Sequence, residues 1–444
     1  MTSARSIKAL LQPEINVGAI APQMLSGQSI LEDRTNPSES NHFDCRQNDW
    51  RFDTSALITR IHGSIDEIDR AAWNLLYPNN PESWNHYRAI ERMPSDNFTY
   101  SAVAAYSGGR LVGAAPMFRV DYRLDDPLGP RSQAVTAWIG RRAPQATRMP
   151  VMGLGSPWSD ECHVGILPGL DDQQRSEVFE GLLAATTKCA AANNVRVLAL
   201  KDVTDDDSHW AKGILKKHQF SAIPSLPVAT LDLPFSSMDE YLASLSANMR
   251  KDLRSKMRKA KSIRIEIRDS IEGLEADILR LYKQTQDNRK ASYDCFDVLP
   301  DSYFRHMMEG LEGRAKLLLC WIGDRLGLVN LFIVENDRVV GKYLGMDYEV
   351  SRKNNLYFVN WMSTVNYCIE NGISSMQVGQ SCYGVKARLG CKLHRSWVYA
   401  KHSGTFVGPI VRAMSRFAAF DKMDPDLREM GKDAPYAAAM KQPI

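Results

Sequence analysis

The feature that most constrains this chain is a hairpin pattern that occurs twice. GGRLVGAAPMF begins at Gly108 and GDRLGLVNLFI begins at Gly323, and the two share the turn glycine, the Arg and the Leu. Each copy follows an apolar run and continues into a second one, which is the pattern of a β-hairpin. A chain of 444 residues is also longer than one compact core usually allows. The sequence therefore predicts two copies of one fold.

The two halves also agree beyond the hairpin. In each half a helix pair precedes the hairpin, and a long amphipathic helix follows it, at 173–192 and at 356–371. A short strand and another short helix come next in both halves. Strands alternate with helices only late in each half, so a mixed sheet is expected rather than a parallel one. The predicted fold class is α/β in the α+β sense, with each mixed central sheet flanked by helices.

Four segments follow from this pattern. Residues 1–50 are rich in Ser, Asn, Gln and Pro without a sustained period, so they are predicted to be a mobile leader. Residues 51–235 and 236–402 are the predicted domains. In the tail, 403–444, the stretch GPIVRAMSRFAAFDKM predicts a short amphipathic helix, which could pack on its own protein or lie on a membrane.

Composition excludes several classes of protein. A hydrophobic content of 44% and a net charge of only +3 are ordinary for a globular protein, so any charge signal must be local and no DNA-binding role is expected. No apolar run reaches the length of a membrane span, and no signal peptide is recognisable, so we expect a cytoplasmic protein. The cysteines form no C-x-x-C pair, and therefore no metal site is predicted.

The strongest local charge lies at 245–262, around NMRKDLRSKMRKAKSIR. Apolar residues recur there at every fourth position, namely Leu245, Met249, Leu253 and Met257. This spacing predicts a helix with one buried side and one basic side. The basic side needs counter-anions, such as tRNA phosphates, an acidic carrier-protein surface or coenzyme A, unless it is simply solvated. The candidate donor-binding residues here are Lys256, Arg258 and Lys259.

The second half resembles the GNAT acyltransferase superfamily. The resemblance rests on Gly345, on the helix from Leu356, on the spacing from Ile369 to Gly379, and on the K-x-x-x-G of KARLG at 386–390. It is closer to the double-domain branch, which contains the Fem-type peptidyltransferases and bacterial peptidoglycan biosynthesis proteins. The resemblance implies tandem GNAT-like domains, of which 51–235 is degenerate and 236–402 is the acyltransferase domain.

The resemblance also implies where an acyl donor binds. GNAT enzymes usually hold the pyrophosphate of coenzyme A on a loop with two small residues, and SRKNNLYF stands at that position here. Asn355 and Tyr357 replace the small residues. Fem-type relatives, which use aminoacyl-tRNA as donor, lack the same glycines. The candidate donor-binding residues of this loop are Arg352, Lys353, Asn354 and Asn355, with a solvated loop as the alternative.

Three residues are candidates for catalysis. Asp347 is the acid closest to the expected cleft and is a candidate base, although it could equally cap the following segment. Lys386 stands where superfamily members often carry a Tyr that protonates the leaving group, and where Fem-type proteins carry a Lys that neutralises donor or oxyanion charge. Tyr383 lies one helical turn earlier and could reach the same space.

These features predict an N-acyltransferase in which an amine attacks an activated acyl or aminoacyl group directly. The co-substrate would be acyl-coenzyme A, an acyl carrier protein or aminoacyl-tRNA, and no permanently bound cofactor is expected. The alternative is a catalytically silent GNAT-fold module that binds RNA or a carrier protein. The segment 131–163 carries no motif, and it is long enough for an active-site flap or for disorder. The amine acceptor is not identified by the sequence.

Overall fold

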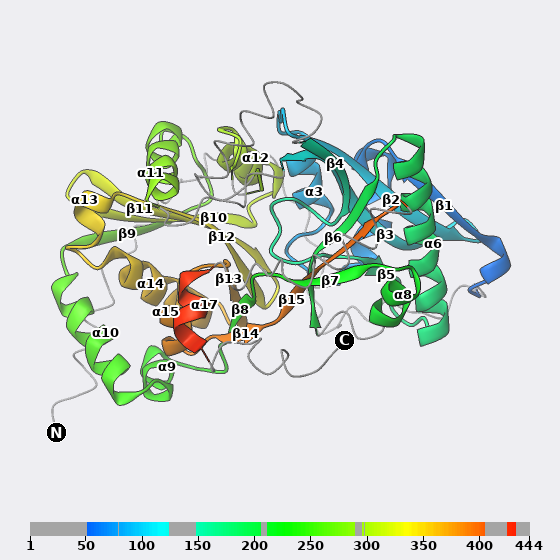
Figure 1. The fold of residues 1–444 in the computed structure, drawn as a ribbon. Coiled ribbons are helices and arrows are strands. Elements are labelled where there is room, and N and C mark those ends of the chain that lie inside the picture. Colours follow the sequence, from blue (N-terminus) through cyan, green and yellow to red (C-terminus); the bar gives the residue numbers. More distant parts are fainter. Residues whose placement is uncertain are drawn as a thin grey trace, which may run out of the picture.

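The structure is a computed structural model, and it describes residues 51–78, 80–123, 148–205, 211–288, 295–296, 298–404 and 424–431. These residues form two mixed β-sheets flanked by helices (Figure 1). The predicted fold class is therefore confirmed. The predicted leader and the predicted amphipathic helix of the tail lie outside the described residues.

The first sheet has the order β1-β2-β3-β4-β6-β15-β7, and β5 pairs with β3. Its strands are β1 (Leu57–His62), β2 (Phe98–Ser107), β3 (Arg110–Arg123), β4 (Arg148–Leu154), β5 (Gly165–Ile166), β6 (Val197–Thr204), β7 (Ser221–Pro224) and β15 (Ser396–His402). The helices of this half are η1 (Thr54–Ala56), η2 (Ile65–Glu67), α2 (Arg70–Leu75), α3 (Trp84–Glu91), α6 (Asp172–Ala192) and α8 (Ala211–Lys217). The long helix α6 confirms the one predicted at 173–192.

The second sheet has the order β14-β8-β13-β12-β11-β10-β9. Its strands are β8 (Val228–Asp232), β9 (Ile263–Arg268), β10 (Ala315–Ile322), β11 (Arg325–Glu335), β12 (Arg338–Met346), β13 (Ser375–Val378) and β14 (Lys392–His394). The helices are α9 (Met238–Ser244), α10 (Ala247–Lys259), α11 (Glu275–Asp287), α12 (Tyr303–Gly310), α13 (Tyr348–Ser351), α14 (Leu356–Glu370), α15 (Tyr383–Arg388) and α17 (Pro425–Met430). The helix predicted from Leu356 is α14.

The two sheets repeat each other strand by strand, which confirms the duplication. β1-β2-β3-β4-β6 corresponds to β9-β10-β11-β12-β13, with antiparallel neighbours followed by one parallel pair in each sheet. Even the irregularity of the hairpin is repeated. A register shift follows the turn in both copies, which leaves Val112 as the extra residue in the first and Gly327 in the second. Gly108 and Gly323 both have positive φ, as the turn requires.

The sheets exchange their last strands, which differs from the predicted boundary between 51–235 and 236–402. β8 precedes that boundary but pairs with β13 and β14 in the second sheet. β15 lies in the predicted second domain but pairs with β6 and β7 in the first sheet. Both strands are short and lie where the chain passes from one sheet to the other. Their own residues therefore do not determine which sheet they join. Long-range pairing decides it.

A shared core joins the two halves. Phe98, Phe118 and Trp158 of the first half pack in one apolar cluster with residues of α11, α12 and the second sheet, among them Tyr303 and Leu331. The ring of Trp158 meets that of Tyr303 edge-on, with centroids 5.8 Å apart. The interface is therefore a packed core rather than a wet contact. Among the helices of the described residues, none is long and apolar enough to cross a membrane.

Candidate functional site

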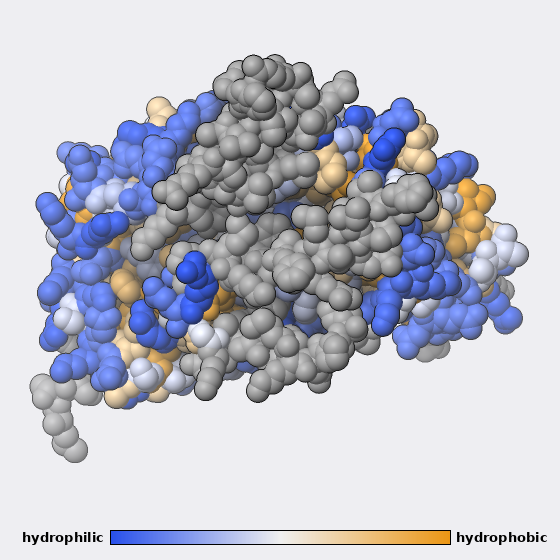
Figure 2. All heavy atoms as spheres, viewed as in Figure 1, coloured by the Kyte–Doolittle hydropathy of each residue, from blue (hydrophilic) through white to orange (hydrophobic). Residues whose placement is uncertain are grey.

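The predicted basic helix is α10, and it lies against the start of α14. Its Met249 and Leu253 are buried, as the four-residue spacing predicts. Lys256 forms an ion pair with Asp252, and its ammonium lies 4.2 Å from the ring centroid of Phe358 in the first turn of α14. The exposed cations of α10 include Lys251, Arg254, Arg258 and Lys259. Figure 2 shows mainly hydrophilic side chains on the edge of the molecule that α10 forms.

The loop at 352–355 leads directly into α14, so the structure brings the two groups of predicted donor-binding residues together. Asn355 has φ 55° and ψ 33°, the left-handed conformation that Asn tolerates better than most residues. Asn354 donates to the carbonyl of Val350 at 2.9 Å, and Arg352 lies over the ring of Tyr348. Lys353 is exposed. Contact of these residues with a donor remains a prediction.

Asp347 is fully buried and is held at the start of α13. One carboxylate oxygen accepts from the backbone N–H of Glu349 at 3.2 Å. The other accepts from Arg325 at 2.8 Å and lies 3.5 Å from Arg280. A base needs a lone pair that faces the proton it removes. These contacts favour the capping interpretation of Asp347 over its role as a base.

Lys386 and Tyr383 are both buried on α15, at the carboxyl end of β13. The Lys386 ammonium donates to the carbonyl of Gly379, the residue that follows β13. Burial lowers the pKa of Lys386, while the nearby thiols and Asp426 favour its charged form. The Tyr383 hydroxyl donates to the carbonyl of Pro227 at 3.0 Å. Lys386 thus places a positive charge beside the end of this strand.

A cluster of buried charges between the two halves has no counterpart in the predictions. Glu82, just before α3, forms an ion pair with Lys342 of β12, and both side chains are 3% exposed. Glu82 also lies 3.1 Å from a ring nitrogen of His163. Burial alone would raise the pKa of Glu82, but the neighbouring Lys342, His86 and His163 hold it well below its usual value. We call these four residues the interdomain cluster.

Lys342 reaches the cluster because of a bulge in β12. Leu331 of β11 faces Tyr343 and the next residue, Phe332, faces Gly341, so Lys342 is the extra residue. A bulge re-aims the side chain at that position. The parallel pairing of β12 with β13 extends only to Val340, so the bulge lies just beyond the point where these strands cease to pair. The signal for this residue in the sequence is a Lys inside the apolar run VVGKYLGM.

A loop after β4 faces the interdomain cluster, and it holds Asp160. The carbonyl of Trp158 accepts from the Lys342 ammonium at 2.8 Å, and that of Ser159 accepts from the Lys201 ammonium at 2.9 Å. On the other side of Asp160, the N–H of Cys162 donates to the carbonyl of Asp202 at 3.0 Å. The loop, residues 155–163, is therefore fixed on both sides of Asp160. It falls in the segment that carried no motif.

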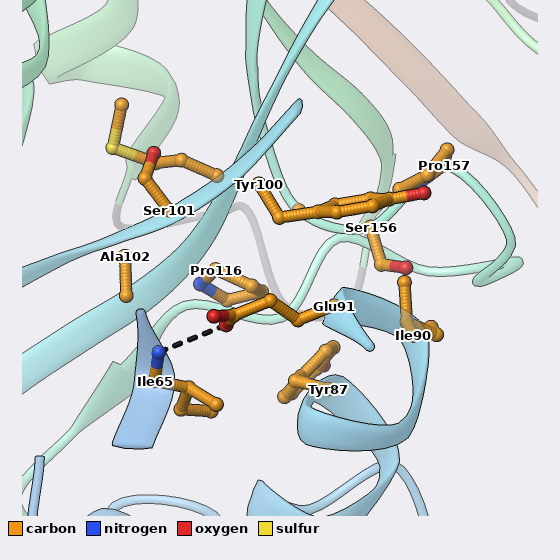
Figure 3. A pocket seen from close by; sticks show the side chains of 12 residues that line it. Ile65, Tyr87, Ile90, Glu91, Tyr100, Ser101, Ala102, Pro116, Ser156 and Pro157 are labelled. Atoms are coloured by element: carbon orange, nitrogen blue, oxygen red, sulfur yellow. Dashed lines mark hydrogen bonds between the residues drawn. The ribbon is translucent and has the colours of Figure 1, made fainter. Parts of the chain in front are cut away.

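A small cavity lies beside the first residues of this loop (Figure 3). Its walls include Tyr87 and Ile90 of α3, Tyr100 of β2 and Ser156 of the loop. Glu91, which also lines it, accepts from the N–H of Ile65 at 2.9 Å. The cavity has a volume of about 20 Å³, room for one or two water molecules. It is too small for an amino acid. Among the described residues, no His, Cys, Asp and Glu side chains are grouped as metal ligands.

Comparison with known proteins gives one family. Residues 166–404, more than half of the chain, match the FemAB-like family, which is described as peptidoglycan biosynthesis/recognition. No curated protein shows a significant sequence match.

Two solved structures are among those similar to this chain. The crystal structure of FemX aligns with a TM-score of 0.54 and 13% identity, covering 80% of this chain and all of FemX. A tandem GNAT protein from the clavulanic acid biosynthesis pathway aligns with a TM-score of 0.47 and 13% identity, covering 78% of this chain and 99% of its own. At this identity the likeness to FemX concerns the fold alone.

Proposed function

The chain belongs to the FemAB-like family, and from that premise we propose that it is an N-acyltransferase that forms an amide bond between an activated acyl or aminoacyl group and an amine. Family and fold together support an acyl or aminoacyl transferase in general. Such a reaction needs a held donor, a deprotonated amine and a positive group for the developing oxyanion, and it needs no bound cofactor.

The position of Lys386 is the observation that carries this proposal. Its ammonium lies at the carboxyl end of β13, close to where β12 and β13 stop pairing. Tyr357, in the first turn of α14, has the same two thiols, Cys382 and Cys391, among its electrostatic neighbours as Lys386 has. The start of α14 and the Lys386 ammonium thus share part of their surroundings, and we propose that a donor bound along α14 brings its reactive carbonyl to Lys386.

The proposed donor is aminoacyl-tRNA. The exposed cations of α10 extend over several helical turns beside the loop at 352–355, which is a longer positive surface than one pyrophosphate needs. The proposed donor contacts are Lys256, Arg258 and Lys259 on α10 together with Arg352 and Lys353 of the loop. Such cations bind a phosphate backbone without regard to its sequence. The proposed acceptor is a soluble amine, and the reaction would occur in the cytoplasm.

A turnover assay with three donor classes tests the proposal. Purified protein is given charged tRNAs, acyl carrier proteins or acyl-coenzyme A, together with free amino acids or a soluble cell-wall precursor peptide that carries a free amine. We expect amide product with charged tRNA. Product only with acyl carrier protein, or only with acyl-coenzyme A, would replace aminoacyl-tRNA by that compound as the proposed donor. Binding of tRNA or carrier protein without product from any donor would contradict the proposal and support the silent binding module.

Charge reversal on α10 tests the donor surface. Replacing Lys256, Arg258 and Lys259 by Glu is expected to raise the KM for charged tRNA about 10-fold or more, because phosphate contacts are lost. The slope of log KM against log salt concentration should fall in magnitude by about two to three. The matched control reverses Lys188, Lys216 and Lys217 on α6 and α8, which carry equal charge on the first half. An equal salt dependence of KM in both variants would show that the basic side of α10 is solvated and does not bind the donor.

A further inference from the structure

We infer that the carboxylate of Asp160 is the general base of this enzyme, which receives the proton of the amine as it attacks the acyl donor. The inference rests on the proposed function and adds to it a residue of the first half. The first half then contributes to the chemistry as well as to the shape of the acceptor side.

The loop presents Asp160 at the junction of the two halves. Lys342 from β12 and Lys201 from β6 each donate to a loop carbonyl, at Trp158 and Ser159, the two residues before Asp160. Their charges also lie close enough to act on Asp160. Two ammonium groups thus hold the loop while their hydrogen bonds go to the backbone and to other carboxylates. The residue Asp160 is partly exposed, although its carboxyl group lies in buried surroundings, and among the described residues neither a hydrogen bond nor an ion pair holds that carboxylate.

The other titratable groups nearby either form ion pairs and hydrogen bonds or have an unsuitable pKa. Glu82 is engaged by Lys342 and His163, and Asp202 by Lys201 and Ser225. Burial lowers the pKa of His86 to about 3, so its imidazole is too weak a base. Burial alone would lower the pKa of His163, but the neighbouring Glu82 raises it and favours the charged ring. A general base must have a free lone pair and a pKa near the working pH.

Asp160 meets that requirement. Burial raises the pKa of its carboxyl to about 6, although Lys342 and Lys201 oppose the shift. At pH 7 the carboxylate is therefore mostly ionised, but it is more basic than an ordinary Asp. The charged or titratable groups that interact electrostatically with it are Lys342 on β12, Lys201 and Asp202 on β6, Glu82 before α3, Lys386 on α15 and Tyr303 on α12.

Lys386 and Asp160 approach the same place from opposite halves. Asp160 is among the charges that favour the ammonium of Lys386. The neighbour of Asp160, Glu161, lies 3.4 Å from Arg338 of β12, and that guanidinium also donates to Gln377 of β13. Lys386 donates to the carbonyl of Gly379, two residues further along. Lys386 therefore lies at the carboxyl end of β13, and the residue next to Asp160 is tied through Arg338 to Gln377 of the same strand. We place the acyl carbon of the donor there, between the two groups.

The proposed step balances without a cofactor. The neutral amine attacks the acyl carbon, a C–N bond forms, and the C–O bond of the ester breaks. The nitrogen loses one proton to the Asp160 carboxylate. The leaving oxygen takes one proton from the Lys386 ammonium, which burial makes a stronger acid. Exchange with solvent then restores both groups.

The test compares Asp160→Asn with Glu161→Gln. Wild-type turnover with charged tRNA is established first. We expect Asp160→Asn to lower kcat/KM about 100-fold or more. In the wild type kcat/KM should rise with pH through about 6, and this rise should disappear in Asp160→Asn. Glu161→Gln should retain both the rate, within a few-fold, and the pH profile, because it neutralises the adjacent carboxylate and leaves the loop clamps in place.

Folding is checked by the melting temperature. A carboxyl whose pKa is raised in the folded state destabilises that state as pH rises between about 4 and 6. Asp160→Asn should therefore melt at pH 7 no lower than the wild type does. An active wild type with an equally active Asp160→Asn variant would overturn the assignment of the base and leave the proposed function intact. A wild type without turnover on any donor would overturn both.

Discussion

Replacing Lys386 by alanine should lower kcat about 100- to 1,000-fold, since one preorganised positive group at a developing oxyanion typically contributes that much. The expected fall in melting temperature is small. Burial disfavours the ammonium form of this side chain, so its removal relieves a desolvation cost while one hydrogen bond to Gly379 is lost. The measurement is single-turnover amide formation with charged tRNA, beside thermal unfolding of the same samples.

Lys386→Met is the matched control for packing. Methionine keeps the length and most of the apolar stem of the lysine but has no charge. Both variants should lose the same activity if the charge acts on the reaction, and Lys386→Met should be the more stable of the two. Wild-type rates in either variant would remove Lys386 from the site.

Replacing Lys342 by alanine is expected to cost about 3–5 kcal/mol of unfolding free energy, because it leaves the buried Glu82 without its main counter-charge. The double variant Lys342→Met with Glu82→Gln should recover much of this loss, since no unpaired charge remains. Urea denaturation of Lys342→Met, of Glu82→Gln and of the double variant gives the coupling free energy. A coupling near zero would contradict the interpretation that these two charges hold each other at the interface.

A second ion pair between the halves is a natural control. Arg70 and Glu312 also join the first and second halves, through two hydrogen bonds of 2.9 and 2.8 Å. Their side chains are 49% and 58% exposed, however, so water screens their attraction. Arg70→Ala should cost less than about 1 kcal/mol. The difference between the unfolding free energies lost in Lys342→Ala and in Arg70→Ala measures how much burial adds to an ion pair.

The buried pair also predicts a pH dependence. Because its neighbours hold the pKa of Glu82 well below 4.5, the stability that Glu82 provides is present above about pH 4.5. It is lost as the pH falls through the lowered pKa of the folded state. In the double variant this acid sensitivity should be reduced.

The fold could be predicted from the sequence because its strongest signals are local. The turn glycine with the following Arg and Leu identified both hairpins, and the four-residue spacing of Met249 and Leu253 identified α10. The exchange of β8 and β15 could not be predicted in the same way. VATLD and SWVYAKH are both short strand patterns, and nothing in either says which sheet will pair with it.

Motif and periodicity in the sequence point to only part of the candidate site. Lys386 followed from the K-x-x-x-G spacing, and the basic helix followed from its charges. Glu82, Asp160 and Lys342 are separated by long stretches of chain, and only tertiary packing makes them neighbours. Of these, Lys342 carried a usable signal, since a lysine inside an apolar strand must find a partner when it is buried. Asp160 in its loop carried none.

The exchanged strand has a consequence for how the protein is made. β15 lies between β6 and β7, so the first sheet stays incomplete until residues 396–402 have emerged from the ribosome. Until then the nascent chain presents β6 as an open edge, which can also pair with the β15 segment of another molecule. The amino-terminal half would thus stay open until β15 has been made, and crowded polysomes would favour intertwined dimers.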